Sequence, residues 1–266
     1  MKSNLRFEFL YQVFALLLAA IIVHAVYVTL IRPAAEEAIE EQRVLAAQVE
    51  DFVPERSIFI VLRDFEQEAC FVLMIWAMAI MGFKARGALR ERSLLETSLI
   101  PIPEGISVLP EDSREYMRPI QALGDEEREY LLPRALLSAL QRFASTRNVQ
   151  DVSEAVRAVC DAESDRLDAE LAMVRYIAWA IPSIGFIGTV RGIGDALGQA
   201  NRAVAGDIAG VTESLGVAFN STFIALVISI IIMFLMHQLQ LLQDRLVLDS
   251  QDYADSRLIR HLQVRE

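Results

Sequence analysis

The sequence predicts an all-α polytopic membrane protein with four transmembrane helices, a helical cytoplasmic domain between the second and third spans, and long cytoplasmic helix extensions. Two long apolar runs lie in the first third of the 266-residue chain and two in the last third, with a polar block between them. No stretch alternates polar and apolar residues as a strand does. Hydrophobic residues make up 54% of the chain, which soluble domains also approach, so their clustering carries the prediction.

The first predicted span covers residues 7–31. At about 1.5 Å per residue, a helix of this length crosses a hydrocarbon layer of roughly 30 Å. Lys2 and Arg6 precede it as in a signal peptide, but the apolar run is longer than a signal core and no small-x-small cleavage site follows. We therefore expect a retained anchor. His24 is expected to make a polar contact with a neighbouring helix, and a proton relay is the alternative.

The second predicted span covers residues 58–83. Its apolar part, Ala69–Phe83, is short for a membrane helix, so the helix is expected to begin near Ile58 with its charged turn at the membrane interface. A basic run follows this span, and Lys2 and Arg6 precede the first one. Lys and Arg favour the cytoplasmic side, so both ends of this helix pair are predicted inside and the acidic segment between the spans outside.

The rest of the chain continues the helical pattern. A helix is expected over 125–146, and another from Asp151 without a break into the third span, predicted at 173–197. The fourth span is predicted at 211–241, and its helix is expected to continue into the cytoplasm because the chain after it contains neither Gly nor Pro. With four spans, both termini are expected in the cytoplasm.

Composition argues against several functions. The formal net charge of −11 disfavours nucleic acid as the main partner, because phosphate binding needs a basic surface. Cys70 and Cys160 have no metal-ligand or redox spacing and are expected to be free thiols. The three histidines lie in different segments, and no Ser–His, Cys–His or metal-ligand arrangement is visible. We therefore expect no enzyme activity, cofactor or bound metal.

One face of the third predicted span is nearly without bulk. Its members are Ala178, Pro182, Gly185, Thr189, Gly192 and Ala196. Gly188 and Gly192 also form a small-xxx-small pair, which lets helices approach closely in lipid. The residues expected to serve helix packing are Pro182, Gly185, Gly188 and Gly192.

The fourth predicted span repeats this pattern with more hydroxyl groups. The residues predicted to face an ion pathway are Thr189, Ser214, Ala218, Ser221, Thr222 and Ser229. From the helical wheel alone, plain helix–helix packing is the simpler interpretation, in which Ser and Thr bond backbone carbonyls. An ion pathway, or a seat for a partner helix, is the alternative.

A second polar set lies outside these faces and consists of Arg191, Asp195, Glu213 and Asn220. Because unpaired charges in a membrane are unfavourable, Arg191 is predicted to pair with Asp195 or Glu213 near the outer boundary. A structural clamp is the simpler interpretation, and direct ion handling is the other. No acidic residue is expected at the depth of the two threonines, so a titratable carboxylate would have to come from another polypeptide.

Two segments resemble a known signature. IPSIGFIGTVRGI, residues 181–193, is similar to a motif in which a proline precedes a GLLGTV-type run. VTESLGVAFNSTFIALVISI, residues 211–230, is similar to its paired motif, in which an acidic residue leads a small, Thr-containing run. Both motifs belong to the channel-forming subunit of the MotA/TolQ/ExbB proton-channel family. The first two spans fit that family by topology only.

The resemblance implies an ion-channel subunit, for H⁺ or Na⁺, in a bacterial inner-membrane motor that performs mechanical work. In this family a homo-oligomer, usually a pentamer, surrounds a dimer of single-span MotB/ExbD/TolR-like partners that carry an intramembrane Asp. Thr189 matches the pore threonine, and Glu213 matches the leading acid of the second motif. Four spans resemble the flagellar stator arrangement, whereas Tol and Ton energisers usually have three.

The sequence departs from the family pattern at two positions. The second pore threonine of the family would fall at Ala218, but the hydroxyls here occur one turn later, at Ser221 and Thr222. Arg191 stands where the family commonly has an apolar or aromatic residue.

The alternative function is a non-conducting membrane scaffold or assembly factor that oligomerises through its small-residue faces. In either case the predicted domains are an N-terminal transmembrane pair, 1–83; a cytoplasmic helical domain, 84–172; a channel pair, 173–243; and a cytoplasmic C-terminal helix, 244–266.

Overall fold

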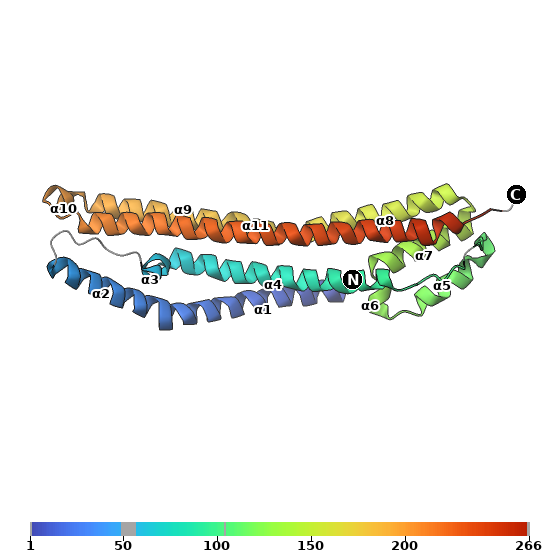
Figure 1. Ribbon diagram of the computed structural model, residues 1–266, viewed down its shortest axis with the longest axis horizontal. Coiled ribbons are helices and arrows are strands. Elements are labelled where there is room, and N and C mark those ends of the chain that lie inside the picture. The colour runs from blue at the N-terminus through green and yellow to red at the C-terminus, as the bar shows by residue number, and fades with distance from the viewer. Residues whose placement is uncertain (1, 49–56, 104, 265–266) are drawn as a thin grey trace. The chain divides into compact units, whose positions relative to one another are not determined.

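The structure is a computed structural model that describes residues 2–48, 57–103 and 105–264 (Figure 1). Within these ranges no strand forms, and one isolated β-bridge pairs Val108 with Leu262. Four helical stretches are long and apolar enough to cross a membrane: Phe7–Leu45, Phe65–Glu96, Val149–Gly198 and Ala209–His261. The predicted all-α, multi-pass membrane fold is therefore confirmed. Residues 49–56 of the predicted outer segment and the terminal residues 1, 265 and 266 lie outside the described residues.

The first span belongs to a helix that continues past its apolar part. Helix α1 (Lys2–Val26) passes through a π-helical turn, η1 (Tyr27–Ile31), into α2 (Arg32–Gln48). The π turn shifts the helical register, and it contains the fully buried Tyr27. The acidic segment after the first span is thus helical up to Gln48.

The second predicted helix is divided in two. Helix α3 (Ile58–Leu62) ends before the pair Arg63–Asp64, and α4 (Phe65–Ser93) begins after it. The prediction of one helix beginning near Ile58 is therefore wrong. The side-chain amide of Gln67 donates to the carbonyl oxygen of Val61 at 3.0 Å, so this side chain caps the end of α3.

The described residues form two compact units. The first comprises residues 1–81 and 173–236, and the second comprises 82–172 and 237–266. The division of the chain into four consecutive domains stays a prediction.

The first unit contains the N-terminal helices together with α9 (Ala172–Gly198), the short α10 (Ala200–Val204) and the first part of α11 (Ala209–Arg257). Within it α1 is bonded to α4, since the Trp76 indole donates to the carbonyl oxygen of Gln12 at 2.9 Å. Helix α4 also approaches α9, where the Cys70 thiol lies 3.7 Å from the carbonyl oxygen of Ile181. Both cysteines of the chain are free and buried, as expected.

The second unit has its own hydrophobic core. Its elements are η2 (Leu94–Glu96), η3 (Pro110–Asp112), α5 (Ser113–Gln121), α6 (Asp125–Arg128), α7 (Leu131–Thr146), α8 (Val149–Glu170), the end of α11 and η4 (Ile259–His261). Leu136, Leu140 and Phe143 of α7 pack in this core with residues of α8 and the end of α11. The core thus joins segments that are far apart in the sequence.

Two helix boundaries in this unit differ from the predicted ones. The predicted helix 125–146 is interrupted between α6 and α7. Helix α8 begins at Val149 rather than Asp151, because the side chain of Asn148 accepts a hydrogen bond from the backbone N–H of Gln150 at 2.9 Å. A single turn residue, Leu171, lies between α8 and α9 inside the helical stretch Val149–Gly198, which runs into the third span.

Three glycines set the spacing between α9 and α11. Gly185, Gly188 and Gly192 are all buried. A β-carbon added at Gly188 would lie 2.5 Å from the Cβ of Ser221, and one added at Gly192 would lie 2.6 Å from the carbonyl oxygen of Ser214. Real carbon atoms do not approach this closely, so the contact requires glycine at these positions.

We expect Gly188→Ala to destabilise the protein by about 1–3 kcal/mol, because the added methyl group overpacks the contact between α9 and α11. Gly194→Ala is the matched control on the same helix, since nothing lies within 4 Å of a β-carbon added there. The control is expected to be neutral or more stable by up to about 1 kcal/mol, from helix propensity alone. Thermal unfolding of the detergent-solubilised protein measures both variants, and equal midpoints would contradict the close contact.

Candidate ion pathway and its charged neighbours

Ser229 of α11 bonds to a backbone carbonyl oxygen of α9 that Pro182 leaves without a helical donor. Proline has no backbone N–H, so Pro182 leaves the carbonyl oxygen of Ala178 without its helical donor. The hydroxyl of Ser229 donates to that oxygen at 3.2 Å, and both residues are buried. The proline of α9 and a serine of α11 are therefore parts of the same interaction.

Thr189 and Thr222 meet in the contact between α9 and α11. Their hydroxyl oxygens are within hydrogen-bonding distance of each other. Thr189 Oγ1 also lies 3.0 Å from the carbonyl oxygen of Ala218, and Thr222 Oγ1 lies 3.1 Å from that of Gly185. Each hydroxyl has one hydrogen but can also accept, so the pair can exchange hydrogen-bond partners by rotating its O–H groups.

Thr189 has an oxygen neighbour on α11 even though position 218 is not a threonine. The backbone carbonyl of Ala218 takes the place of a side-chain oxygen beside Thr189. The serines on the same face have partners within the chain: Ser214 accepts from Gln199 at 3.0 Å, and Ser221 donates to Val217 at 2.9 Å. Their role in an ion pathway stays a prediction.

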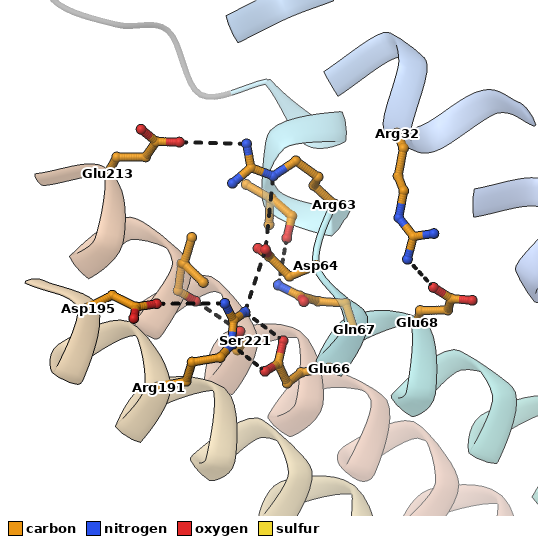
Figure 2. Close-up of polar contacts among 12 residues, drawn as sticks. Arg32, Arg63, Asp64, Glu66, Gln67, Glu68, Arg191, Asp195, Glu213 and Ser221 are labelled. Atoms are coloured by element: carbon orange, nitrogen blue, oxygen red, sulfur yellow. Dashed lines mark hydrogen bonds and ion pairs between the residues drawn. The ribbon is translucent and has the colours of Figure 1, made fainter. Parts of the chain in front are cut away.

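Arg191 is the centre of a charged cluster beside this contact (Figure 2). Its guanidinium donates twice to Glu66, with Nε 2.8 Å from Oε1 and Nη2 2.9 Å from Oε2. It also lies 3.6 Å from a carboxylate oxygen of Asp64 and 3.9 Å from one of Asp195. The predicted pair with Asp195 is confirmed, but the bidentate bond with Glu66 is shorter and was not predicted.

Glu213, the predicted alternative partner of Arg191, pairs instead with Arg63 at 3.6 Å. Arg63 in turn lies 4.0 Å from Asp64, so the break between α3 and α4 brings both of its charged residues into the cluster. Asn220 is half-buried on α11.

Glu66 corrects one sequence-based expectation. A β-carbon added at Gly188 would lie 3.2 Å from the Cγ of Glu66, so this carboxylate side chain lies next to the residue that precedes Thr189. The expectation that the chain has no acidic residue at this depth is therefore wrong. The Glu66 carboxylate is held by Arg191, and its side chain is only 12% exposed.

Glu68 makes a second polar contact between the first two spans. Its carboxylate accepts from Arg32 and lies 2.7 Å from Nδ1 of His24. The guanidinium of Arg32 also lies 4.4 Å from the centre of the Phe65 ring. The predicted polar contact of His24 with a neighbouring helix is therefore confirmed. Among the residues that the structure describes, no group of three or more His, Cys, Asp or Glu side chains is arranged to hold a metal ion.

Comparison with known proteins agrees with the two sequence motifs. Residues 127–252 match the model of the MotA/TolQ/ExbB proton channel family. The matched segment includes the glycines, the threonine pair and Arg191, whereas Asp64 and Glu66 lie outside it. No curated protein and no solved structure matches the chain.

This family consists of channels and energy transducers, not of known enzymes, and its members work with partner proteins in membrane complexes. The resemblance predicted from residues 181–193 and 211–230 is confirmed, because both motifs lie inside the matched segment. Over residues 127–252 the chain is thus similar to the MotA/TolQ/ExbB proton channel family, whose members have a proton-channel-type function in energy-transducing membrane complexes.

Proposed function

We propose that this chain is the proton-conducting subunit of a bacterial inner-membrane motor, with Thr189 and Thr222 beside the path of the ion. The observation that carries the proposal is the contact between these two hydroxyls, inside the segment that matches the family. Hydroxyls that can both donate and accept stabilise a passing hydronium ion or an ordered water without carrying a charge themselves. Na⁺ is the other ion that such oxygens could serve.

The titratable carboxylate of the path is proposed to come from a partner. Glu66 lies beside Gly188, but both of its carboxylate oxygens are already bonded to Arg191. A carboxylate that must bind and release a proton therefore fits better on a second polypeptide. We propose a dimer of a MotB/ExbD/TolR-like single-span protein that carries an intramembrane Asp.

The proposed complex is a ring of five copies of this chain around that dimer. Large apolar side chains on α9 and α11 are exposed in the single chain, among them Trp179 at 76% and Phe219 at 66%. In the membrane these side chains are available to lipid, to other copies and to the partner. The basic run after the second span supports a cytoplasmic location for both termini. Ion flow through the ring would then be coupled to mechanical work.

One observation favours the alternative, a non-conducting scaffold. Each threonine hydroxyl also lies within hydrogen-bonding distance of a backbone carbonyl, that of Ala218 for Thr189 and that of Gly185 for Thr222. Helix packing alone would produce these bonds. Ion flux distinguishes the two functions, because a scaffold assembles but does not conduct.

We expect the double variant Thr189→Val/Thr222→Val to lower proton flux by about tenfold or more, equivalent to about 1.4 kcal/mol in the barrier. Valine keeps the shape of threonine but removes both hydroxyls. The matched control is Thr212→Val on α11, whose exposed hydroxyl donates to the carbonyl oxygen of Ile208 at 3.0 Å. Flux is measured in liposomes that contain the complex with its partner, under an imposed pH gradient. Full activity of the double variant would refute the pathway.

Native mass analysis of the purified complex tests the assembly. The expected mass is that of five copies of this 29.8 kDa chain with two copies of a single-span protein. Dissociation in the gas phase should release the partner, whose span should contain an Asp. A monomer, or an oligomer that contains this chain alone, would contradict the proposed motor.

A further inference from the structure

The positive charge of Arg191 lies near the height of the proposed ion path. Arg191 follows Thr189 by two residues on α9, which is a rise of about 3 Å and a turn of about 160°, so its side chain leaves α9 on another side than that of Thr189. An unbalanced cation at such a depth repels a passing cation, and low dielectric surroundings strengthen that repulsion.

The compensating charges come from the start of the second span and, at 3.9 Å, from Asp195 on α9 itself. Glu66 binds the guanidinium through both carboxylate oxygens, and Asp64 lies 3.6 Å from it. Both carboxylate side chains are 12% exposed, whereas that of Arg191 is 43% exposed. Bidentate charge-assisted bonds of this kind are among the strongest in proteins.

The bond between Glu66 and Arg191 depends on the space beside Gly188. Gly188 has no side chain, and the Cγ of Glu66 occupies the space beside it, 3.2 Å from where a β-carbon would lie. Glu66 therefore reaches α9 one turn before Arg191 and turns its carboxylate toward the guanidinium. Arg191 is inside the family-matching segment and Glu66 and Asp64 are outside it, so the guanidinium and these two carboxylates belong to different parts of the chain.

We propose that Glu66, supported by Asp64, is a selectivity-determining residue that neutralises Arg191 and so keeps the adjacent path permeable to cations. The inference rests on the proposed proton conduction. A mechanical clamp between α4 and α9 would use the same bonds, but it makes a different prediction. If the bond acts as a clamp, every variant that breaks the bond between Glu66 and Arg191 should lose flux. If the bond acts through charge, removal of both the carboxylate and the guanidinium should restore flux.

The test compares Glu66→Gln with Glu66→Gln/Arg191→Met in the reconstituted complex. We expect the single variant to lower proton flux by about tenfold, because it removes the bidentate counter-charge and leaves the guanidinium with only its longer contacts to Asp64 and Asp195. The double variant should recover to within about twofold of the wild type, since neither charge remains. The control is Glu40→Gln, which removes the same charge from an exposed pair with Arg43 on α2.

A second measurement covers the case in which the double variant does not assemble. Raising the ionic strength screens an uncompensated charge, so it should partly restore flux through the Glu66→Gln complex. If Glu66→Gln lowered the flux only by loosening the contact between α4 and α9, added salt should not restore the flux. Flux of Glu66→Gln equal to the wild type, or a double variant that assembles and stays as low as the single one, would overturn the inference. A wild-type complex without flux would instead refute the proposed function.

Discussion

The close approach of α9 and α11 is the constraint on which the membrane unit depends. It exists because Gly185, Gly188 and Gly192 have no side chain where the helices meet. At this spacing a hydroxyl on one helix reaches a backbone carbonyl on the other, as Ser229 reaches Ala178 and Thr189 reaches Ala218. In lipid such bonds cannot be replaced by water, so they fix the register of the pair as well as its distance.

Gly188 also connects this packing to the electrostatics of the unit. The empty position of its side chain is shared by Ser221 of α11 and Glu66 of α4. A side chain at this single position would therefore disturb both the helix contact and the carboxylate that binds Arg191. The N-terminal helix pair is thus more than an anchor, because α4 supplies carboxylates that bind Arg191 of the family-matching segment.

Local patterns in the sequence predicted most of the helices but not the points where tertiary contacts divide them. Apolar runs and the lack of breakers correctly indicated four membrane helices and the long α11. The break at Arg63–Asp64 was missed because its cause is distant: these side chains pair with Glu213 and Arg191. Glu66 was missed as the main partner of Arg191 because 125 residues separate the two. The sequence did offer one signal for such a partner, because an arginine in a membrane needs a carboxylate to pair with. Helical spacing alone pointed to Asp195 as that carboxylate.

Two carboxylates near the N-terminal end of α4, Glu66 and Glu68, bind different cations. Glu68 binds Arg32 and contacts His24, so its partners belong to the first helix and its continuation. Glu66, two residues earlier, binds a residue of α9 instead. Residues two apart on a helix point in directions about 160° apart, because each residue turns the helix by about 100°. Helix α4 therefore separates the two ion pairs, one binding it to the N-terminal helices and the other binding it to α9.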